Sequence, residues 1–302
     1  MSPRPPIRTV FCAALAALFA LPAAADALWT ENAEEAMAEA AKEGKDLLID
    51  VTGSDWCVWC QRLDEEVFSK EPFTTQVPKH FVLLKLDYPR DRKLPEAIKK
   101  QNAEWKKKLP FSGYPTVFLA DAAGKPYAKT GYRRGGAEPY VEHLLELKKI
   151  GDQLDQALEK AQKAEGIEKA KLLDQALSPV DPELVMHCYA DLVESIVELD
   201  AQGEAGLKAK YGAMAALKKV NAAIQGGQFD RAIELADQAL KTYAASGQMA
   251  QDILFSKSIA LYNKKDKPAA KKALEAAIEA APQGEKAEQI QRIIERVFKD
   301  VD

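Results

Sequence analysis

The feature that most constrains the fold is a close pair of cysteines, Cys57 and Cys60, at the point where a strand pattern gives way to a helix pattern. The apolar run Leu47–Val51 has the length of a buried strand, and residues 57–68 follow with helical spacing. A C-x-x-C pair at such a junction can be a redox-active dithiol, half of a zinc site or a structural staple. The residues around the pair have to distinguish these three chemistries.

A metal site is the less favoured interpretation of the pair. Structural zinc needs four ligands, usually from a second C-x-x-C or from paired histidines, whereas His80, His143 and His187 are scattered and no second cysteine pair exists. A single pair could still hold a soft ion such as Cu(I), but the five methionines do not cluster in the sequence. We therefore expect no metal and no cofactor apart from the redox-active Cys57–Cys60 disulfide.

The N-terminus has the pattern of a secretory signal peptide. Arg4 and Arg8 precede the apolar run Val10–Leu21, and small residues follow it. We expect a signal peptide over residues 1–25, cleaved after Ala25 or, as a second choice, after Ala27. An uncleaved membrane anchor is the alternative. The mature protein is then predicted to be periplasmic or secreted.

Charge and cysteine content exclude several classes for the mature chain. Loss of the two arginines of the leader changes the formal net charge from −4 to −6, which argues against nucleic acid as a partner. Only Cys57, Cys60 and Cys188 remain, whereas a disulfide-stapled scaffold would carry an even, well-spaced set. Cys188 lies among apolar residues at helical spacing and is expected to be a buried structural residue.

The mature chain has two parts with different patterns. Over residues 26–150, strand and helix signals alternate and end in a hairpin, which predicts an α/β sheet with a parallel part and an antiparallel edge. The expected strands are 47–51, 81–88, 116–120 and 127–132; the expected helices are 31–43, 57–68 with Ser54 or Asp55 as its cap, 92–108 and 138–149.

Residues 151–302 have almost no strand signal and predict an all-α domain. The stretch Gly227–Leu240 aligns with Lys265–Ile278 at an offset of 38 residues, with Ala232 and Ala270 at equivalent positions. This pattern resembles a degenerate pair of tetratricopeptide repeats, in which small residues let paired helices approach closely. An ordinary Ala-rich helical bundle is the alternative. Such a region would serve docking or self-association.

The position of the cysteine pair favours redox chemistry. At a helix N-terminus, unpaired backbone N–H groups and the helix dipole stabilise a thiolate, so Cys57 is the expected nucleophile. Cys60, one turn further along, suits a resolving thiol that releases a mixed disulfide.

These residues identify the first part as similar to the thioredoxin superfamily, over roughly residues 28–150. The chain has a strand, Trp-Cys-x-x-Cys, a helix, and then Gly113-Tyr114-Pro115-Thr116, which resembles the cis-proline loop of the family. A trans proline that merely starts an edge strand is the alternative. The resemblance implies a substrate groove formed by Trp56, Trp59, Tyr114 and Pro115. The W-C-x-W-C sequence is most similar to secreted or lipoprotein-associated bacterial thioredoxin-like proteins.

The resemblance also implies an acid and a lysine beside the dithiol. Asp50 stands at the place of the buried acid of the family, although one extra residue separates it from Cys57, and Lys85 is similar to the lysine partner of that acid. A partly desolvated carboxylate has a raised pKa and can take the proton from Cys60. Either residue could instead be a surface charge at a strand end, because an insertion can change which face a side chain occupies.

The sequence thus predicts a thiol–disulfide oxidoreductase that acts on disulfides of exported proteins and exchanges electrons with a membrane donor or acceptor. Val58 and Trp59 place no positive charge between the cysteines, which favours a reductase over an oxidase or isomerase. The competing hypothesis is a non-enzymatic scaffold in which the helical repeats act and the dithiol is a resting disulfide. Retention of both the dithiol and the Gly-x-Pro-Thr loop argues against it.

Overall fold

The computed structural model describes residues 28–244, 246–284 and 286–299. The expected signal peptide, residues 1–25, lies outside these described residues. Within them, we find no helix with the length and apolar character needed to span a membrane.

A five-stranded mixed sheet forms the centre of the first part. Its order is β1-β3-β2-β4-β5, with β1, β3 and β2 parallel and β4 and β5 antiparallel to their neighbours. The bounds are β1 Trp29–Thr30, β2 Asp46–Thr52, β3 Phe81–Asp87, β4 Thr116–Ala120 and β5 Pro126–Thr130. The predicted mixed α/β sheet is confirmed, and the short β1 is an addition to it.

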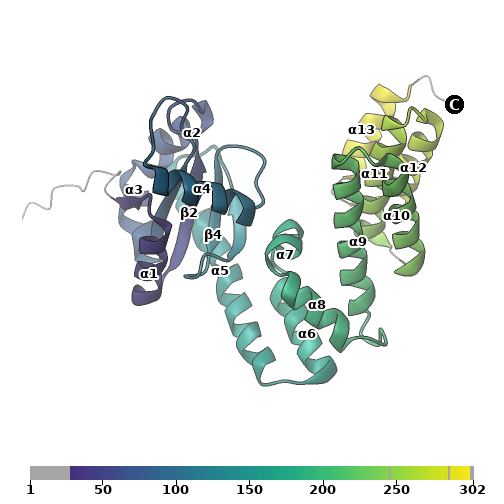
Figure 1. Ribbon diagram of the computed structural model, residues 1–302, viewed down its shortest axis with the longest axis horizontal. Coiled ribbons are helices and arrows are strands. Elements are labelled where there is room, and N and C mark those ends of the chain that lie inside the picture. Colours follow the sequence, from purple (N-terminus) through teal and green to yellow (C-terminus); the bar gives the residue numbers. More distant parts are fainter. Residues whose placement is uncertain (1–27, 245, 285, 300–302) are drawn as a thin grey trace, which may run out of the picture.

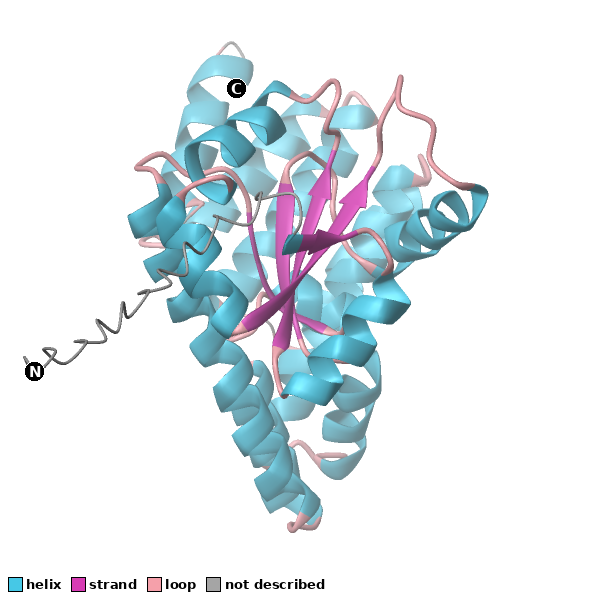
Figure 2. Cartoon of the chain, turned by 90° about the vertical axis from the view of Figure 1, so that its left-hand side faces the viewer, coloured by secondary structure: helices cyan, strands magenta, loops and turns pink. Residues whose placement is uncertain are grey.

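Helices lie on both sides of this sheet (Figure 2). In chain order they are α1 (Ala33–Glu43), α2 (Val58–Leu63), the π-helical turn η2 (Asp64–Phe68), α3 (Glu71–Gln76), the 3₁₀ turn η3 (Val77–Lys79), α4 (Glu96–Lys108) and α5 (Ala137–Gln162). Because both faces are covered, β2 and β3 consist almost entirely of buried residues.

Helix α5 is longer than the sequence pattern predicts. The predicted end was residue 149, but the helix continues to Gln162, so Ile150 lies inside it. Gly151 explains how α5 stays close to the sheet: a Cβ at this position would lie 2.7 Å from the ring of Tyr127. The Tyr127 hydroxyl donates a hydrogen bond to Asp46 at the start of β2, 2.7 Å away. A glycine in mid-helix is intrinsically unfavourable, and here the close approach to a buried aromatic ring offsets that cost.

The described residues after α5 are helical, as predicted. They form α6 (Gly166–Leu177), α7 (Pro182–Cys188), α8 (Ala190–Leu199), α9 (Leu207–Gln225), α10 (Phe229–Thr242), α11 (Gly247–Asn263), α12 (Lys267–Ala280) and α13 (Ala287–Val297). In Figure 1, α6, α7 and α8 lie between the sheet and the stack of α9 to α13.

Three hydrophobic cores follow one another along the molecule. The first continues without interruption from the sheet through α5, α6, α7 and α8 to Met214 of α9. The second lies among α9, α10 and α11, and the third among α11, α12 and α13. The aligned residues Ala232 and Ala270 are fully buried in the second and third cores, in α10 and α12 respectively. The 38-residue offset therefore relates two successive helix pairs, α9–α10 and α11–α12.

Candidate active site

The cysteine pair lies at one edge of the sheet, where three segments meet. Parallel strands β2 and β3 both end at this edge, and antiparallel β4 begins there, since Val51 of β2 is paired with Thr116 of β4. The connection from β2 to α2 carries Cys57, and the residue before Thr116 is Pro115. The topology thus brings together two motifs that are more than fifty residues apart in the sequence.

Cys57 itself is the N-cap of α2, which corrects the expectation that Ser54 or Asp55 would cap this helix. Its sulfur accepts a hydrogen bond from the backbone N–H of Cys60, at 3.2 Å. This N–H also donates to the carbonyl of Cys57, at 3.0 Å, and its bond to the sulfur favours negative charge there. Cys57 and Cys60 are both buried and are joined by a disulfide, with their Cα atoms 5.2 Å apart.

Ser54 and Asp55 instead hold the cysteine loop against the end of β3 and the segment that follows it. The backbone N–H and hydroxyl of Ser54 donate to the buried carboxylate of Asp87, at 2.9 and 2.6 Å. Asp55 accepts the backbone N–H groups of Arg90, Asp91 and Arg92, and these bonds lower its pKa. The position of the loop is therefore set by contacts with residues more than thirty positions away.

Trp56 packs against the segment that follows β3. Its indole N–H donates to the carbonyl of Tyr88, at 2.9 Å, and the guanidinium of Arg90 lies 4.2 Å from its ring centroid. Gly53 lies directly against the ring, since a Cβ there would be 2.5 Å from it. The glycine that ends β2 is thus required by the packing of the tryptophan.

The Tyr114–Pro115 peptide bond is cis, in agreement with the predicted cis-proline loop. The Thr116 hydroxyl donates to the carbonyl of Gly113, at 2.8 Å. The ring of Tyr114 lies edge-on to Trp56, with centroids 5.3 Å apart. This contact places the loop beside the disulfide.

Trp59, between the two cysteines in the sequence, is open to solvent. Its exposed fraction is 46%, and that of Val58 is 60%. The Trp59 ring packs on Tyr132, with centroids 5.1 Å apart, and the guanidinium of Arg62 lies 5.0 Å from the centroid of the Trp59 ring. Large exposed apolar side chains next to a reactive pair are a surface on which a protein partner can dock.

Asp50 lies in the central strand and is almost completely buried, with an exposed fraction of 4%. Its Oδ1 has no hydrogen-bond partner within the described residues. Burial raises the pKa of this carboxyl from an ordinary 3.8 to about 7, and the charge of Lys85 opposes the shift. The negative charges of Asp64 and Asp87 raise the pKa further.

Lys85 lies beside Asp50. The two residues are paired in register across β2 and β3, so their side chains leave the same face of the sheet. The Lys85 ammonium lies 5.5 Å from the ring centroid of Trp29, and its side chain is half-buried. Asp50 is therefore not a surface charge at a strand end, and Lys85 lies partly buried beside it.

Cys188 is remote from this edge of the sheet. It ends α7 and is half-buried rather than fully buried, with its sulfur 3.8 Å from the carbonyl of Lys108. Burial raises the pKa of the thiol to about 11, so it is protonated at neutral pH. The neighbouring His187 contacts the carbonyl of Lys107, at 3.2 Å, and does not activate the thiol.

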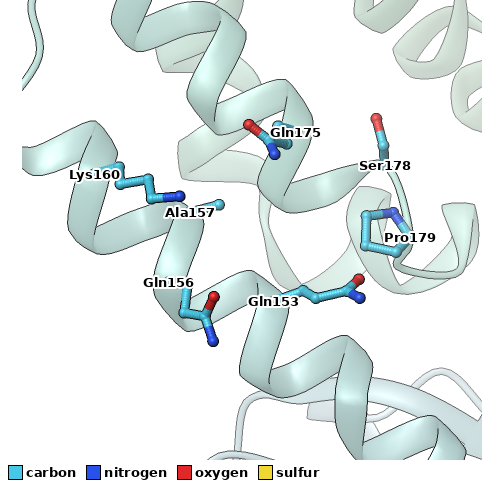
Figure 3. Close-up of a pocket in the computed structure, with 7 residues that line it drawn as sticks. All are labelled: Gln153, Gln156, Ala157, Lys160, Gln175, Ser178 and Pro179. Carbon is cyan, nitrogen blue, oxygen red and sulfur yellow. The ribbon is translucent and has the colours of Figure 1, made fainter.

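Two hollows lie outside the disulfide region. A small one between α5 and α6, about 350 Å³ in volume, is lined by Gln153, Gln156, Ala157, Lys160, Gln175, Ser178 and Pro179 (Figure 3). No cysteine is among these seven residues, so the hollow has no group for thiol–disulfide exchange. A larger groove lies among α7, α9 and α11. Among the described residues, no three His, Cys, Asp or Glu side chains gather as a metal site would require.

Sequence reasoning missed the group that holds the cysteine loop. Arg92 donates to Asp87 at 2.7 Å and also pairs with Glu31. The buried carboxylate of Asp87 therefore accepts hydrogen bonds both from Ser54 in the cysteine loop and from Arg92 after β3. Asp87 is an acidic residue at the carboxyl end of an apolar strand, where functional residues of α/β sheets are often found. This feature of the sequence could have identified it. Its partners lie too far away in the sequence to be inferred.

Comparison with known proteins finds relatives of the first part of the chain. A family profile described as Thioredoxin-like matches residues 28–122. The chain is similar to "Disulfide bond reductase DsbH" of Chlamydia pneumoniae, with 30% identity over 128 residues, 42% of this chain and 76% of that protein. It is also similar to "Thioredoxin-related protein DsbJ" of the same organism, with 28% identity over 92 residues, 30% of this chain and 26% of DsbJ. A solved structure described as "DsbH Oxidoreductase" is 28% identical and covers 40% of this chain and 83% of its own, with a TM-score of 0.38.

Proposed function

The chain belongs to the thioredoxin superfamily and is a thiol–disulfide oxidoreductase, and from this premise we propose that it reduces disulfides in exported proteins outside the cytoplasm. The observations that carry the proposal are the Cys57–Cys60 disulfide at a helix start and, in the strand that leads to it, the buried carboxylate of Asp50 with a pKa of about 7. The printed name of the relative DsbH supports the reducing direction.

The proposed reaction starts from the reduced pair. The Cys57 thiolate attacks one sulfur of a client disulfide, forms a mixed disulfide and expels the other client sulfur as a thiolate. The Cys60 thiol then passes its proton to Asp50, and the resulting thiolate attacks the Cys57 sulfur. The two client sulfurs leave as thiolates that take up one proton from Asp50 and one from water, and Cys57–Cys60 becomes the disulfide seen in the structure. A dithiol donor at the membrane would return two electrons to the pair.

Four residues are proposed to bind the client chain around this chemistry. Trp56 and Tyr114 form one apolar wall, and the exposed Trp59 forms the other. Pro115 would lie against the client backbone beside the disulfide. Lys85 would act through Asp50, since its charge opposes the rise in the carboxyl pKa. No cofactor beyond the cysteine pair is proposed.

The helical region is proposed to be a docking module related to tetratricopeptide repeats. Two successive helix pairs related by 38 residues, each with a buried alanine at the same position, support this interpretation. A scaffold without redox activity is less well supported, because scaffolding needs neither the buried Asp50 nor the disulfide.

The deciding experiment is a redox titration. The mature chain is equilibrated in graded glutathione buffers, and the state of the pair is read by tryptophan fluorescence. A potential near that of thioredoxin, about −270 mV, would support the reductase, whereas about −120 to −180 mV would make the protein an oxidase or isomerase. If the cysteine pair exchanges with glutathione in none of the buffers, the hypothesis that the protein is an oxidoreductase is refuted. N-terminal sequencing of the exported protein, with a start at Asp26 expected, tests the localisation.

A further inference from the structure

The large groove among α7, α9 and α11 has the size of a ligand site, with a volume of about 860 Å³. In Figure 1, α7 lies between the sheet and α9, so this groove belongs to the part of the helical region that faces the redox domain. Its floor includes the buried side chains of Val185, Tyr211 and Met214. Its rim includes exposed residues such as Ala222.

The groove gathers methionines from three separate helices. Met186 comes from α7, Met214 from α9 and Met249 from α11, and together they are three of the five methionines in the chain. They are up to 63 positions apart in the sequence, so they form a group only after folding. Methionine is flexible and polarisable, and it is frequent at surfaces that bind varied apolar partners. Met186 and Met249 are only partly buried, so they remain accessible in the groove.

The charged side chains at the rim already have partners within the chain. Lys210 donates to Asp174, Lys218 donates to the carbonyl of Met186, Asp252 pairs with Lys286, and Glu183 pairs with Lys129. Three of these four charges are thus compensated by an opposite charge, the ammonium of Lys218 is held on a carbonyl, and the floor between them is apolar. Recognition in the groove therefore favours an uncharged, apolar segment over an acidic or basic one.

The groove reaches the segment that leads to the redox site. Pro110 lines it, and the next residue, Phe111, packs on Tyr114, with ring centroids 5.7 Å apart. Tyr114 in turn packs on Trp56 beside the disulfide, at 5.3 Å. A band of apolar and aromatic side chains thus leads from the groove to the reactive sulfur.

The same segment of the chain positions both sites. The wall formed by α7 is fixed to the end of α4, where His187 contacts the carbonyl of Lys107, at 3.2 Å. Cys188 lies 3.8 Å from the next carbonyl, that of Lys108. Residues 107–116 therefore run from the anchor of the groove wall to the start of β4, next to Pro115.

We infer that this groove binds an extended, apolar segment of the same polypeptide whose disulfide is presented to Cys57. The inference rests on the proposed function for the identity of the occupant, an incompletely folded client chain. Such segments are exposed before folding is complete, when a wrong disulfide still needs reduction. The groove would lower the KM for protein clients and leave the reaction with small disulfides unchanged.

The test uses a probe that has no disulfide, so that binding is separated from redox chemistry. The full mature chain is titrated with fluorescently labelled insulin B chain whose cysteines are carboxymethylated. The variant Ala222→Glu places a carboxylate on the exposed rim and should weaken binding about tenfold, because apolar contact would desolvate the charge. Met249→Gln is a second variant that removes an apolar contact. Gln238→Glu adds the same charge at an exposed position of α10 outside the groove and should bind as the wild type does.

Enzymatic rates give the second readout. With intact insulin, Ala222→Glu should lower kcat/KM by a similar factor, while its rate with a small aromatic disulfide stays within twofold of the wild type. Equal binding by wild type, Ala222→Glu and Met249→Gln would overturn the inference. A change from dimer to monomer in Ala222→Glu, seen by sedimentation, would overturn it too, because the occupant would then be a second copy. If the wild type reduces no disulfide, the proposed function fails. Binding of the carboxymethylated B chain still tests whether the groove holds an apolar segment.

Discussion

The buried carboxylate of Asp50 makes the stability of the protein depend on pH in a direction that can be stated in advance. In the unfolded chain this group titrates near its ordinary value, about 3.9. In the fold its pKa is about 7, chiefly because burial penalises the ionised form. Between these two values the unfolded chain has released the proton that the folded protein retains, so the free energy of unfolding decreases as pH rises.

The size of the effect follows from the shift. Each pKa unit corresponds to about 1.36 kcal/mol. The move from 3.8 to about 7 is therefore worth about 4 kcal/mol, present in full below pH 4 and lost as pH rises through 7. Asp50→Asn cannot ionise, so the variant should lack this loss. The amide will pay a roughly constant cost of about 1–3 kcal/mol if it finds no partner, since Oδ1 of the aspartate has none within the described residues.

The assay is urea unfolding of the disulfide form, followed by tryptophan fluorescence between pH 4 and pH 8. The diagnostic quantity is the difference in unfolding free energy between wild type and Asp50→Asn as a function of pH. Asp191→Asn is the matched control, because Asp191 has a side chain that is 70% exposed, and it should run parallel to the wild type. A constant difference between wild type and Asp50→Asn across the whole range would refute the reasoning about burial.

Three further substitutions test the site and the packing that supports it. Cys60→Ser should trap a mixed disulfide with a client protein, seen as a higher band on a non-reducing gel that disappears with reductant. Gly53→Ala should destabilise the protein by about 1–3 kcal/mol, because the new Cβ would lie 2.5 Å from the Trp56 ring; an unchanged unfolding midpoint would contradict this. Gly151→Ala should also cost about 1–3 kcal/mol in denaturant unfolding, although alanine is the better helix former, because its Cβ would lie 2.7 Å from the Tyr127 ring.

Local sequence signals predicted most of the sheet and little of what holds the active loop. The strands were found within about two residues of their ends because buried strands are short apolar runs bounded by turns. The prediction of Ser54 or Asp55 as a helix cap was wrong, because both residues instead bond to partners at the end of β3 and just after it. Helix α5 was predicted too short, because its composition changes at position 150 while its hydrogen bonding continues to Gln162.

The sequence by itself determined the chemistry of this protein. A C-x-x-C pair between strand and helix patterns, with Gly-Tyr-Pro-Thr later in the chain, is a local signal that needs no tertiary contact to be read. Pro115 and Asp50 come together only in the fold. The antiparallel pairing of β4 with β2 places Pro115, just before Thr116, near the end of β2 that carries Asp50.

Only the tertiary structure decided how the chemistry is tuned and what surrounds it. The pKa of Asp50 depends on the number of atoms that exclude water from it, and no local pattern records that number. The groove among α7, α9 and α11 likewise depends on three helices that meet only in the fold. Hydrophobic periodicity shows that a residue faces inward, but packing between distant elements decides which neighbours it meets.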